Sequence, residues 1–291
     1  MLTLKEVSLR KGKRTYLDEV SFTAEAGRIT AIVGTRSAGR TELVRIIMGL
    51  IAADEGSIEL EDFELDFGDR QNFGYLPAER GGYPNMRVLD QIVYLARLHG
   101  ITLGAAERNA LTLLGHLELA DRGYAPLKNL SGAEIARVDI AATLAADPDV
   151  VVIDDAFAGL DAASLRLVTS LLRAHASSGV PVILATDDWE AAQTFADDVV
   201  ILGQGKVTAK GSVEKLLDDP HFRVETTDTD AAASALKSRT GISDVKTAGR
   251  ERVSFRANDA RSAAAAVAEL ENVKNFESVR PTLAEQYKEA L

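Results

Sequence analysis

The chain has 291 residues, of which 46% are hydrophobic and 26% charged, and its formal net charge is −11. Such a composition is typical of a globular protein with enough apolar residues for one large core or two ordinary ones. The absence of cysteine excludes disulfides, thiolate metal sites and thiol catalysis, and the negative charge leads us to expect no nucleic-acid partner.

The N-terminal part alternates short strands with a glycine-rich turn and a helix. Apolar patterning predicts strands at Leu2–Leu4, Val7–Leu9, Val20–Ala24 and Ile29–Val33, and a helix from Thr41 to Leu50. The turn before this helix fits the phosphate-loop pattern G-x-x-x-x-G-K-[ST] except for an arginine in place of the lysine. It consists of Gly34, Thr35, Arg36, Ser37, Ala38, Gly39, Arg40 and Thr41.

This loop predicts a nucleotide site. Its glycines let successive backbone N–H groups curl around phosphate oxygens at the N-terminus of the next helix. In the pattern, the lysine reaches the β- and γ-phosphates and the Ser or Thr hydroxyl holds Mg²⁺. Arg40 keeps the positive charge but replaces a compact ammonium with a broad planar fork. We therefore predict a nucleotide site with altered catalysis.

The central part predicts a helical insert followed by a parallel sheet. Apolar residues at helical spacing indicate that residues 85–148 are mainly helical. The continuous apolar run Val150–Ile153 predicts a buried central strand that ends in Asp154 and Asp155. Helices and strands then alternate, which predicts an α/β fold with crossover helices. The predicted elements are Ser164–Ala174, Val182–Ala185, Trp189–Phe195 and Val199–Leu202.

The last part predicts a small second domain. Its elements follow the order β-α-β-β-α-β, which indicates a ferredoxin-like α+β domain. They are Phe222–Thr226, Ala231–Ser238, Asp244–Thr247, Arg252–Arg256, Ala260–Leu270 and Val273–Val279, with a terminal helix at Thr282–Leu291. We place the domains at residues 1–217 and 218–291, with Asp218, Asp219 and Pro220 as a linker.

Further segments follow the phosphate loop in a set order. A segment before a helix contains Leu130, Ser131, Gly132, Ala133 and Glu134. Asp154 and Asp155 come next, and Leu160-Asp161 follow them. Over residues 1 to about 217, this order closely resembles the ATP-binding subunits of ABC transporters, with their L-S-G-G-Q signature, Walker B strand and L-D turn. Gly74–Pro84 and the C-terminal extension resemble the branch linked to sodium and drug export.

The resemblance implies a P-loop NTPase core of the ABC type, with residues 85–148 as the signature subdomain. It implies ATP and Mg²⁺ as cofactors, with Thr41 and Asp154 as the Mg²⁺ pair. A second ATP-binding subunit would pack head to tail, so that each ATP lies between the loop of one and the signature of the other. A separate permease would dock on the insert. Since no apolar run of about 18 residues occurs, we expect a cytoplasmic protein, and the resemblance implies that it is peripheral on the inner face of the membrane.

Several positions depart from the family pattern. Asp155 stands where a glutamate polarises the attacking water, and a displacement of about 1 Å can cost roughly 10²-fold in rate. Asp187 occupies the place of the switch histidine, where at about 6 Å and a dielectric near 20 it would repel a phosphate charge by roughly 3 kcal/mol. Ala78 or Glu79 sits where a glutamine helps to coordinate Mg²⁺. Arg40 can reach nucleotide or a carboxylate, and a salt bridge to Asp187 would compensate for both substitutions.

Two departures affect contacts with adenine and with a partner. The position at which an aromatic residue stacks on adenine aligns with Lys11, while Tyr16 lies close enough in the sequence to replace it or to pack elsewhere. In the signature, Ala133 replaces a glycine whose backbone approaches phosphate closely.

We therefore predict a degenerate ATP-binding subunit that hydrolyses ATP poorly and pairs with a competent subunit. An active homodimeric export ATPase and a soluble regulatory or scaffold protein without a permease are the alternatives.

Overall fold

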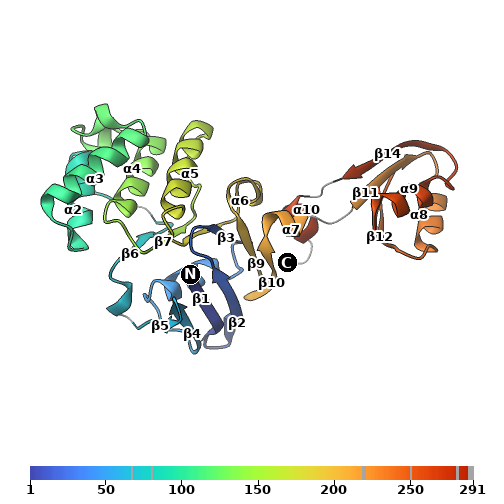
Figure 1. The fold of residues 1–291 in the computed structure, drawn as a ribbon, viewed down its shortest axis with the longest axis horizontal. Coiled ribbons are helices and arrows are strands. Elements are labelled where there is room, and N and C mark those ends of the chain that lie inside the picture. Colours follow the sequence, from blue (N-terminus) through green and yellow to red (C-terminus); the bar gives the residue numbers. More distant parts are fainter. Residues whose placement is uncertain (67, 80, 218–220, 250, 280–281, 288–291) are drawn as a thin grey trace. The chain divides into compact units, whose positions relative to one another are not determined.

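The structure is a computed structural model that describes residues 1–291 except 67, 80, 218–220, 250, 280–281 and 288–291 (Figure 1). It contains two compact units, the first built on Met1–Val213 and the second comprising Glu214–Gln286. The division between the units follows Val213, whereas the predicted boundary follows residue 217, at the end of α7 (Val213–Leu217). The predicted linker residues Asp218, Asp219 and Pro220 lie outside the described residues, as does Arg80.

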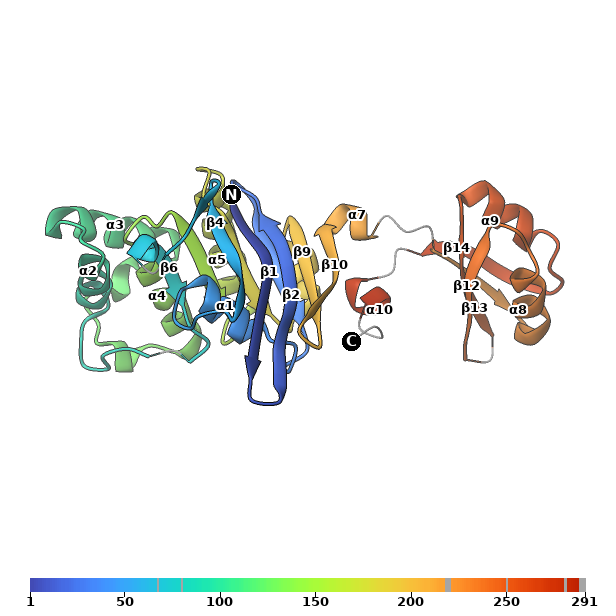
Figure 2. The same ribbon diagram turned by 90° about the horizontal axis from the view of Figure 1, so that it is seen from below.

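The chain begins with a four-stranded antiparallel sheet in the order β2-β1-β4-β5. Its strands are β1 (Leu2–Lys11), β2 (Arg14–Ala24), β4 (Glu55–Leu60) and β5 (Phe63–Glu64). The two short strands predicted before residue 10 form the single strand β1, because the chain passes through an irregularity at Glu6 (φ +51°) without leaving the sheet. The β1–β2 hairpin extends well beyond the rest of this sheet (Figure 2).

The second sheet has six strands in the order β10-β9-β3-β8-β7-β6. All neighbouring strands are parallel except the pair β10–β9. The parallel sheet predicted from the buried apolar runs is therefore present. The strands are β3 (Ile29–Gly34), β6 (Phe73–Leu76), β7 (Val150–Asp154), β8 (Val182–Thr186), β9 (Asp198–Gly203) and β10 (Lys206–Ser212).

Helix α1 (Arg40–Ile47) links the two sheets through a shared core. Its buried residues Leu43 and Ile47 belong to one apolar cluster with residues of β1 and β2 on one side and Val152 and Ile183 on the other. The helix was predicted to reach Leu50. It ends at Ile47 because Gly49 takes a left-handed conformation (φ +69°), a common way for a helix to stop.

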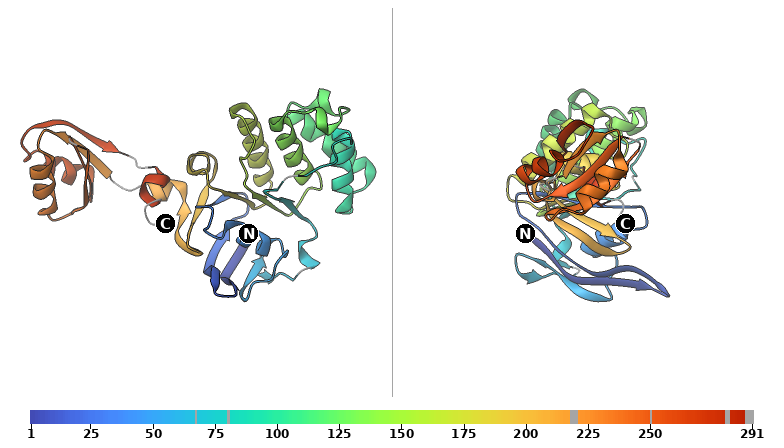
Figure 3. Two further views of the ribbon diagram at one scale, coloured as in Figure 1. Left: turned by 180° about the vertical axis from the view of Figure 1, so that it is seen from behind. Right: turned by 90° about the vertical axis from the view of Figure 1, so that its right-hand side faces the viewer.

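The insert is helical, as predicted. It contains α2 (Val88–Leu98), α3 (Leu103–His116) and α4 (Gly132–Leu144), with 3₁₀ turns at Ala120–Arg122 and Leu127–Asn129. These three helices pack against one another (the blue-green to yellow-green helices in the left panel of Figure 3). Two further helices follow strands of the parallel sheet: α5 (Ala162–Ala176) comes after β7, and α6 (Trp189–Phe195) comes after β8. Within the described ranges, no helix combines the length and the apolarity needed to cross a membrane.

The C-terminal unit has the predicted ferredoxin-like topology, with an antiparallel sheet in the order β12-β13-β11-β14. Phe222 stacks on Phe255 and on Phe276, with 5.8 Å between ring centroids in both pairs. The terminal helix is described from Leu283 to Tyr287, and the rest of the predicted helix lies outside the described residues. The other elements are β11 (His221–Thr226), α8 (Thr229–Lys237), β12 (Ile242–Ala248), β13 (Arg252–Ala257), α9 (Ala260–Val267) and β14 (Val273–Val279).

Candidate nucleotide site

The phosphate loop connects β3 to α1, and both of its glycines are required by close contacts. Gly39 has φ +95°, and a Cβ there would lie 2.5 Å from the carbonyl oxygen of Tyr16. A Cβ at Gly34 would lie 2.5 Å from the carbonyl oxygen of Leu202. None of the described side chains caps the first turn of α1. Its backbone N–H groups therefore keep the arrangement that binds an anion.

Parallel pairing brings the other candidate residues to the same edge of the sheet. Strand β8 lies between β3 and β7, so the carboxyl ends of all three strands point the same way. The loop follows β3, Asp154 and Asp155 stand at the end of β7, and Asp187 follows β8. In open α/β sheets this edge is the usual place for a ligand.

Arg40 and Asp187 form the ion pair that the sequence suggested as a compensation. The Arg40 Nη2 atom lies 3.7 Å from Asp187 Oδ2, and Arg36 Nε lies 3.7 Å from the same oxygen. The Arg40 side chain is only 12% exposed, whereas that of Arg36 is 94% exposed. Burial lowers the pKa of Arg40, and Asp187 opposes this more than Asp154 or Asp155 does. Arg40 remains a cation and has Asp187 as its principal counter-charge.

Asp154 has the chemistry of a magnesium ligand. It is buried, with 3% of its surface exposed, and its Oδ2 atom makes no hydrogen bond to any described residue. Burial raises the pKa of its carboxyl, while the side-chain hydrogen bond with Thr41 and the charge of Arg40 oppose that rise. A carboxylate beside a hydroxyl is a donor set that suits Mg²⁺ when phosphate oxygens and water complete the shell. The two residues predicted as the Mg²⁺ pair therefore lie together.

Asp155 has an unusual backbone conformation. Its φ is +54°, in the left-handed region that aspartate enters more readily than most residues. The following residue, Ala156, donates a backbone hydrogen bond to the carbonyl of Ala185 at 3.1 Å, which holds the turn against β8. The charge of Asp155 also acts on Arg40. The acidic residue thus stays in the site, in a backbone conformation that is uncommon for residues other than glycine.

Sequence reasoning missed two residues near Asp154. Arg45 opposes the rise in the pKa of Asp154 and forms a side-chain hydrogen bond with Tyr75. Arg45 stands four positions after Thr41, so both lie on one face of α1. This i, i+4 spacing was the signal that could have identified Arg45.

The segment after β6 is fixed by a residue that the sequence did not single out. Gln91 is buried (1% exposed), and its Oε1 atom accepts a hydrogen bond from the backbone N–H of Tyr83 at 2.7 Å. Ala78 and Glu79 are exposed. Glu79 is therefore an exposed candidate for the role that a glutamine has in the family.

Tyr16 lies beside the loop, and its ring already contacts two cationic side chains. Its carbonyl oxygen faces Gly39, which places its backbone next to the phosphate loop. The ring is half-buried against the apolar core. The Arg14 guanidinium lies 4.5 Å and the Lys11 ammonium 5.5 Å from its centroid, both within the range of cation–π interactions. An adenine ring would have to displace one of these cations.

The signature segment forms the N-terminus of α4. The Ser131 hydroxyl accepts a hydrogen bond from the Glu134 N–H, and the Glu134 carboxylate accepts one from the Ser131 N–H at 2.8 Å. This capping box lowers the pKa of Glu134, and Arg122 assists. Leu130 is buried, whereas Gly132 is exposed and Ala133 half-buried. A Cβ at Gly132 would meet no described atom within 4 Å. The described hydrogen bonds of this segment therefore stabilise the start of α4.

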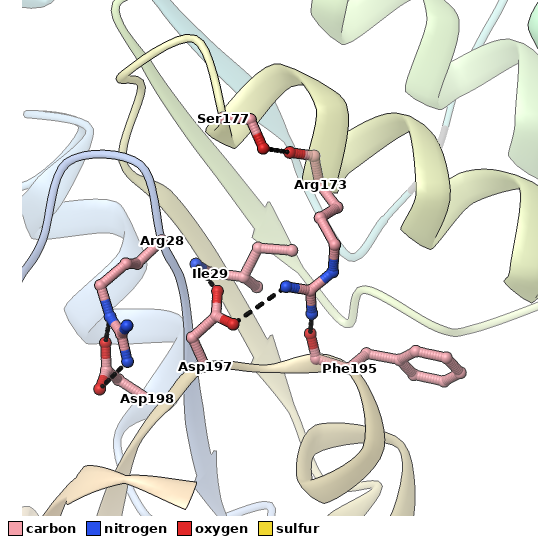
Figure 4. Close-up of polar contacts among 7 residues, drawn as sticks. All are labelled: Arg28, Ile29, Arg173, Ser177, Phe195, Asp197 and Asp198. Carbon is pink, nitrogen blue, oxygen red and sulfur yellow. Dashed lines mark hydrogen bonds and ion pairs between the residues drawn. The ribbon is translucent and has the colours of Figure 1, made fainter.

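Asp197 and Asp198 have a structural role (Figure 4). Asp197 accepts hydrogen bonds from the Ile29 N–H at 2.9 Å and from Arg173 at 3.0 Å. Burial by itself raises the pKa of Asp197, but these two donors outweigh it and leave the pKa below its ordinary value. Asp198 pairs with Arg28 through two hydrogen bonds of 2.5 and 2.8 Å. Together they fix the starts of β3 and β9.

Comparison with known proteins gives consistent matches. A family model described as ABC transporter matches residues 17–158. The uncharacterised ABC transporter ATP-binding protein YhaQ of Bacillus subtilis (strain 168) is 27% identical over 242 residues, 83% of this chain and 81% of YhaQ. A solved ATP-binding subunit of an ABC transporter matches with a TM-score of 0.68 and 25% identity, over 74% of this chain and 91% of the other.

Two further relatives carry names that differ in the direction of transport. The Nod factor export ATP-binding protein I of Ralstonia nicotianae is 26% identical, over 75% of this chain and 68% of its own length. The sulfate/thiosulfate import ATP-binding protein CysA of Mesostigma viride is 28% identical, over 75% of this chain and 64% of its own length.

Proposed function

Because the chain belongs to the ATP-binding subunits of ABC transporters, we propose that it is a poorly hydrolytic member of a heteromeric complex. It binds Mg²⁺-ATP through the phosphate loop, Thr41 and Asp154. It pairs with a second ATP-binding subunit that hydrolyses ATP, and both dock on a separate permease at the inner face of the membrane. Export is the proposed direction, on the basis of the segment Gly74–Pro84 and the C-terminal domain.

The proposal rests on the ion pair between Arg40 and Asp187, two positions at which this chain departs from the family pattern. Arg40 holds its charge against Asp187 at 3.7 Å, so neither side chain is positioned as an independent partner for a terminal phosphate. Gly34 and Gly39, in contrast, remain in contacts that only glycine fits. A site that keeps its binding loop while its charged residues neutralise one another is better suited to holding nucleotide than to hydrolysing it.

Turnover measurements test the degenerate site. ATPase activity of the purified chain is compared with that of the triple variant Arg40→Lys, Asp155→Glu, Asp187→His. We expect a rise of at least about 10²-fold, the range over which a positioned base contributes. An active wild-type chain that gains little from the triple change would instead support a homodimeric export ATPase. Asp149→Asn, which changes an exposed carboxylate elsewhere, is the control.

Pairing requires a variant that keeps the capping box intact. Asp is as good an N-cap residue as Ser, so Ser131→Asp preserves the start of α4 while adding an anion at the signature. In the complex co-expressed with its competent subunit, we expect ATPase activity to fall, because this anion faces the partner's nucleotide. Unchanged activity would show that this signature does not serve the partner. Failure of the chain to sediment with permease-containing membranes would favour the scaffold alternative.

A further inference from the structure

One carboxylate lies between the two arginines of the phosphate loop. Asp187 Oδ2 is 3.7 Å from Arg36 Nε and 3.7 Å from Arg40 Nη2. The arginines are four positions apart, and Asp187 comes from the turn after β8, the strand that lies next to β3 in the sheet. A carboxylate and a phosphate oxygen are the two anions that a guanidinium binds best, with similar geometry. Asp187 therefore occupies the position of a phosphate ligand of these side chains.

The two arginines differ in their freedom to accept a new anion. Arg36 is 94% exposed and can follow an incoming ligand, whereas Arg40 is 12% exposed and is confined beside Asp187. Asp187 itself is 46% exposed, so it can turn towards solvent. An anion that takes Arg40 must either displace Asp187 or lie close to its negative charge. Both cost free energy that a less highly charged ligand avoids.

Backbone N–H groups and arginine side chains therefore differ in how favourably they bind the successive phosphates of a nucleotide. The N–H groups of the loop and of the first turn of α1 have no described side-chain cap and bind phosphate through the backbone. The arginine side chains are the groups already neutralised by Asp187. A phosphate held by the backbone gains its full contacts, whereas a further phosphate that reaches the arginines competes with Asp187.

We propose that Asp187 is a specificity-determining residue that removes the preference of this site for a nucleoside triphosphate, so that the diphosphate binds at least as tightly. The inference rests on the proposed nucleotide binding and concerns the same site. It predicts that the concentration of the diphosphate affects the occupancy of the site as much as the concentration of the triphosphate does. Hydrolysis is not needed for such a subunit to respond to the ratio of the two nucleotides.

The test is a titration of the full chain with Mg²⁺-ADP and with Mg²⁺-ATP, in the wild type and in Asp187→Asn. Asparagine keeps the size of the side chain and removes its charge. We expect the wild-type ratio Kd(ATP)/Kd(ADP) to be one or more, and we expect Asp187→Asn to lower it about tenfold. Raising the ionic strength should shrink this difference, because Asp187 is half-exposed.

Glu190→Gln is the matched control. Glu190 is an exposed carboxylate in the first turn of α6, shortly after Asp187 in the chain, so its removal changes the net charge by the same amount. This variant should keep the wild-type ratio. A ratio that stays within twofold in Asp187→Asn, or falls equally in Glu190→Gln, overturns the inference while nucleotide binding stands. A wild-type chain that binds neither nucleotide overturns the proposed function and the inference together.

Discussion

The Arg40 guanidinium and the Asp187 carboxylate lie 3.7 Å apart, and they come from the two elements that follow neighbouring parallel strands. A buried arginine without a counter-charge is costly, and burial already lowers the pKa of Arg40. Asp187 supplies the largest opposing charge. An arginine at position 40 is therefore stabilised by the aspartate at position 187.

This coupling should be measurable as a free energy of unfolding. We expect Asp187→Ala to lower it by about 1 kcal/mol, because Arg40 loses its principal counter-charge while it stays buried. In an Arg40→Met background the same change should cost much less, which gives a coupling energy of roughly 0.5–1 kcal/mol. Arg36→Ala is the control and should have an effect within about 0.5 kcal/mol, since Arg36 is exposed. Additive effects of the Arg40 and Asp187 substitutions would contradict the coupling.

Asp154→Asn should separate stability from nucleotide binding. Asp154 is buried with one carboxylate oxygen unpaired among the described residues, and burial raises the pKa of its carboxyl. Removing that charge should stabilise the nucleotide-free protein by about 1 kcal/mol, because a buried carboxylate with an unpaired oxygen destabilises the folded state. The Mg²⁺-dependent part of ATP affinity should be lost at the same time. Thermal unfolding without nucleotide, and ATP titrations with Mg²⁺ or with EDTA, test the two halves separately.

The sequence left two roles open for Tyr16, which are stacking on adenine, now at the cost of displacing a cation, and packing against the loop. If the ring stacks on adenine, Tyr16→Leu should weaken ATP binding by about tenfold, within the range of base–aromatic stacking. Arg14→Ala should strengthen it, because the Arg14 guanidinium then no longer covers the ring. Neither change should alter the affinity for inorganic tripolyphosphate, which has no base. Equal losses for ATP and tripolyphosphate in Tyr16→Leu would show instead that the ring supports the loop.

Asp197 should make stability depend on pH. Its pKa is lowered in the folded protein by donors that outweigh burial, so its contribution is complete above the pKa of the unfolded chain, about 3.9. That contribution is lost as pH falls through the lower, folded pKa. At pH 7 we expect Asp197→Asn to reduce the free energy of unfolding by about 1–2 kcal/mol.

Urea unfolding at a series of pH values checks this prediction. The difference between wild type and Asp197→Asn should begin to shrink below about pH 4, where the carboxylate of the unfolded chain becomes protonated, and should vanish below the lower pKa of the native carboxylate. Asp149→Asn is a suitable control, because Asp149 is an exposed carboxylate bonded to Asn72. A difference that stays constant with pH would mean that Asp197 acts through shape and hydrogen bonding rather than charge.

Most of the fold could be predicted because its signals are local. The apolar runs of β7 and β8, the helical spacing of the insert and the order of elements after residue 220 each lie within a short stretch of sequence. The strands β4, β5, β6 and β10 were missed. Strand β4 has a mixed burial pattern and β5 has two exposed residues, so neither alternates clearly enough to be recognised.

The sequence by itself determined the phosphate loop, the parallel sheet and the resemblance to ABC transporters, because glycine spacing and hydrophobic period depend on neighbouring residues. Only the tertiary structure decided which charges meet. That Asp187 contacts Arg36 as well as Arg40, that Arg14 covers Tyr16 and that Gln91 holds Tyr83 depends on which elements lie side by side. Side-chain partners from separate elements are fixed by strand order and packing, and a single sequence carries no direct record of either.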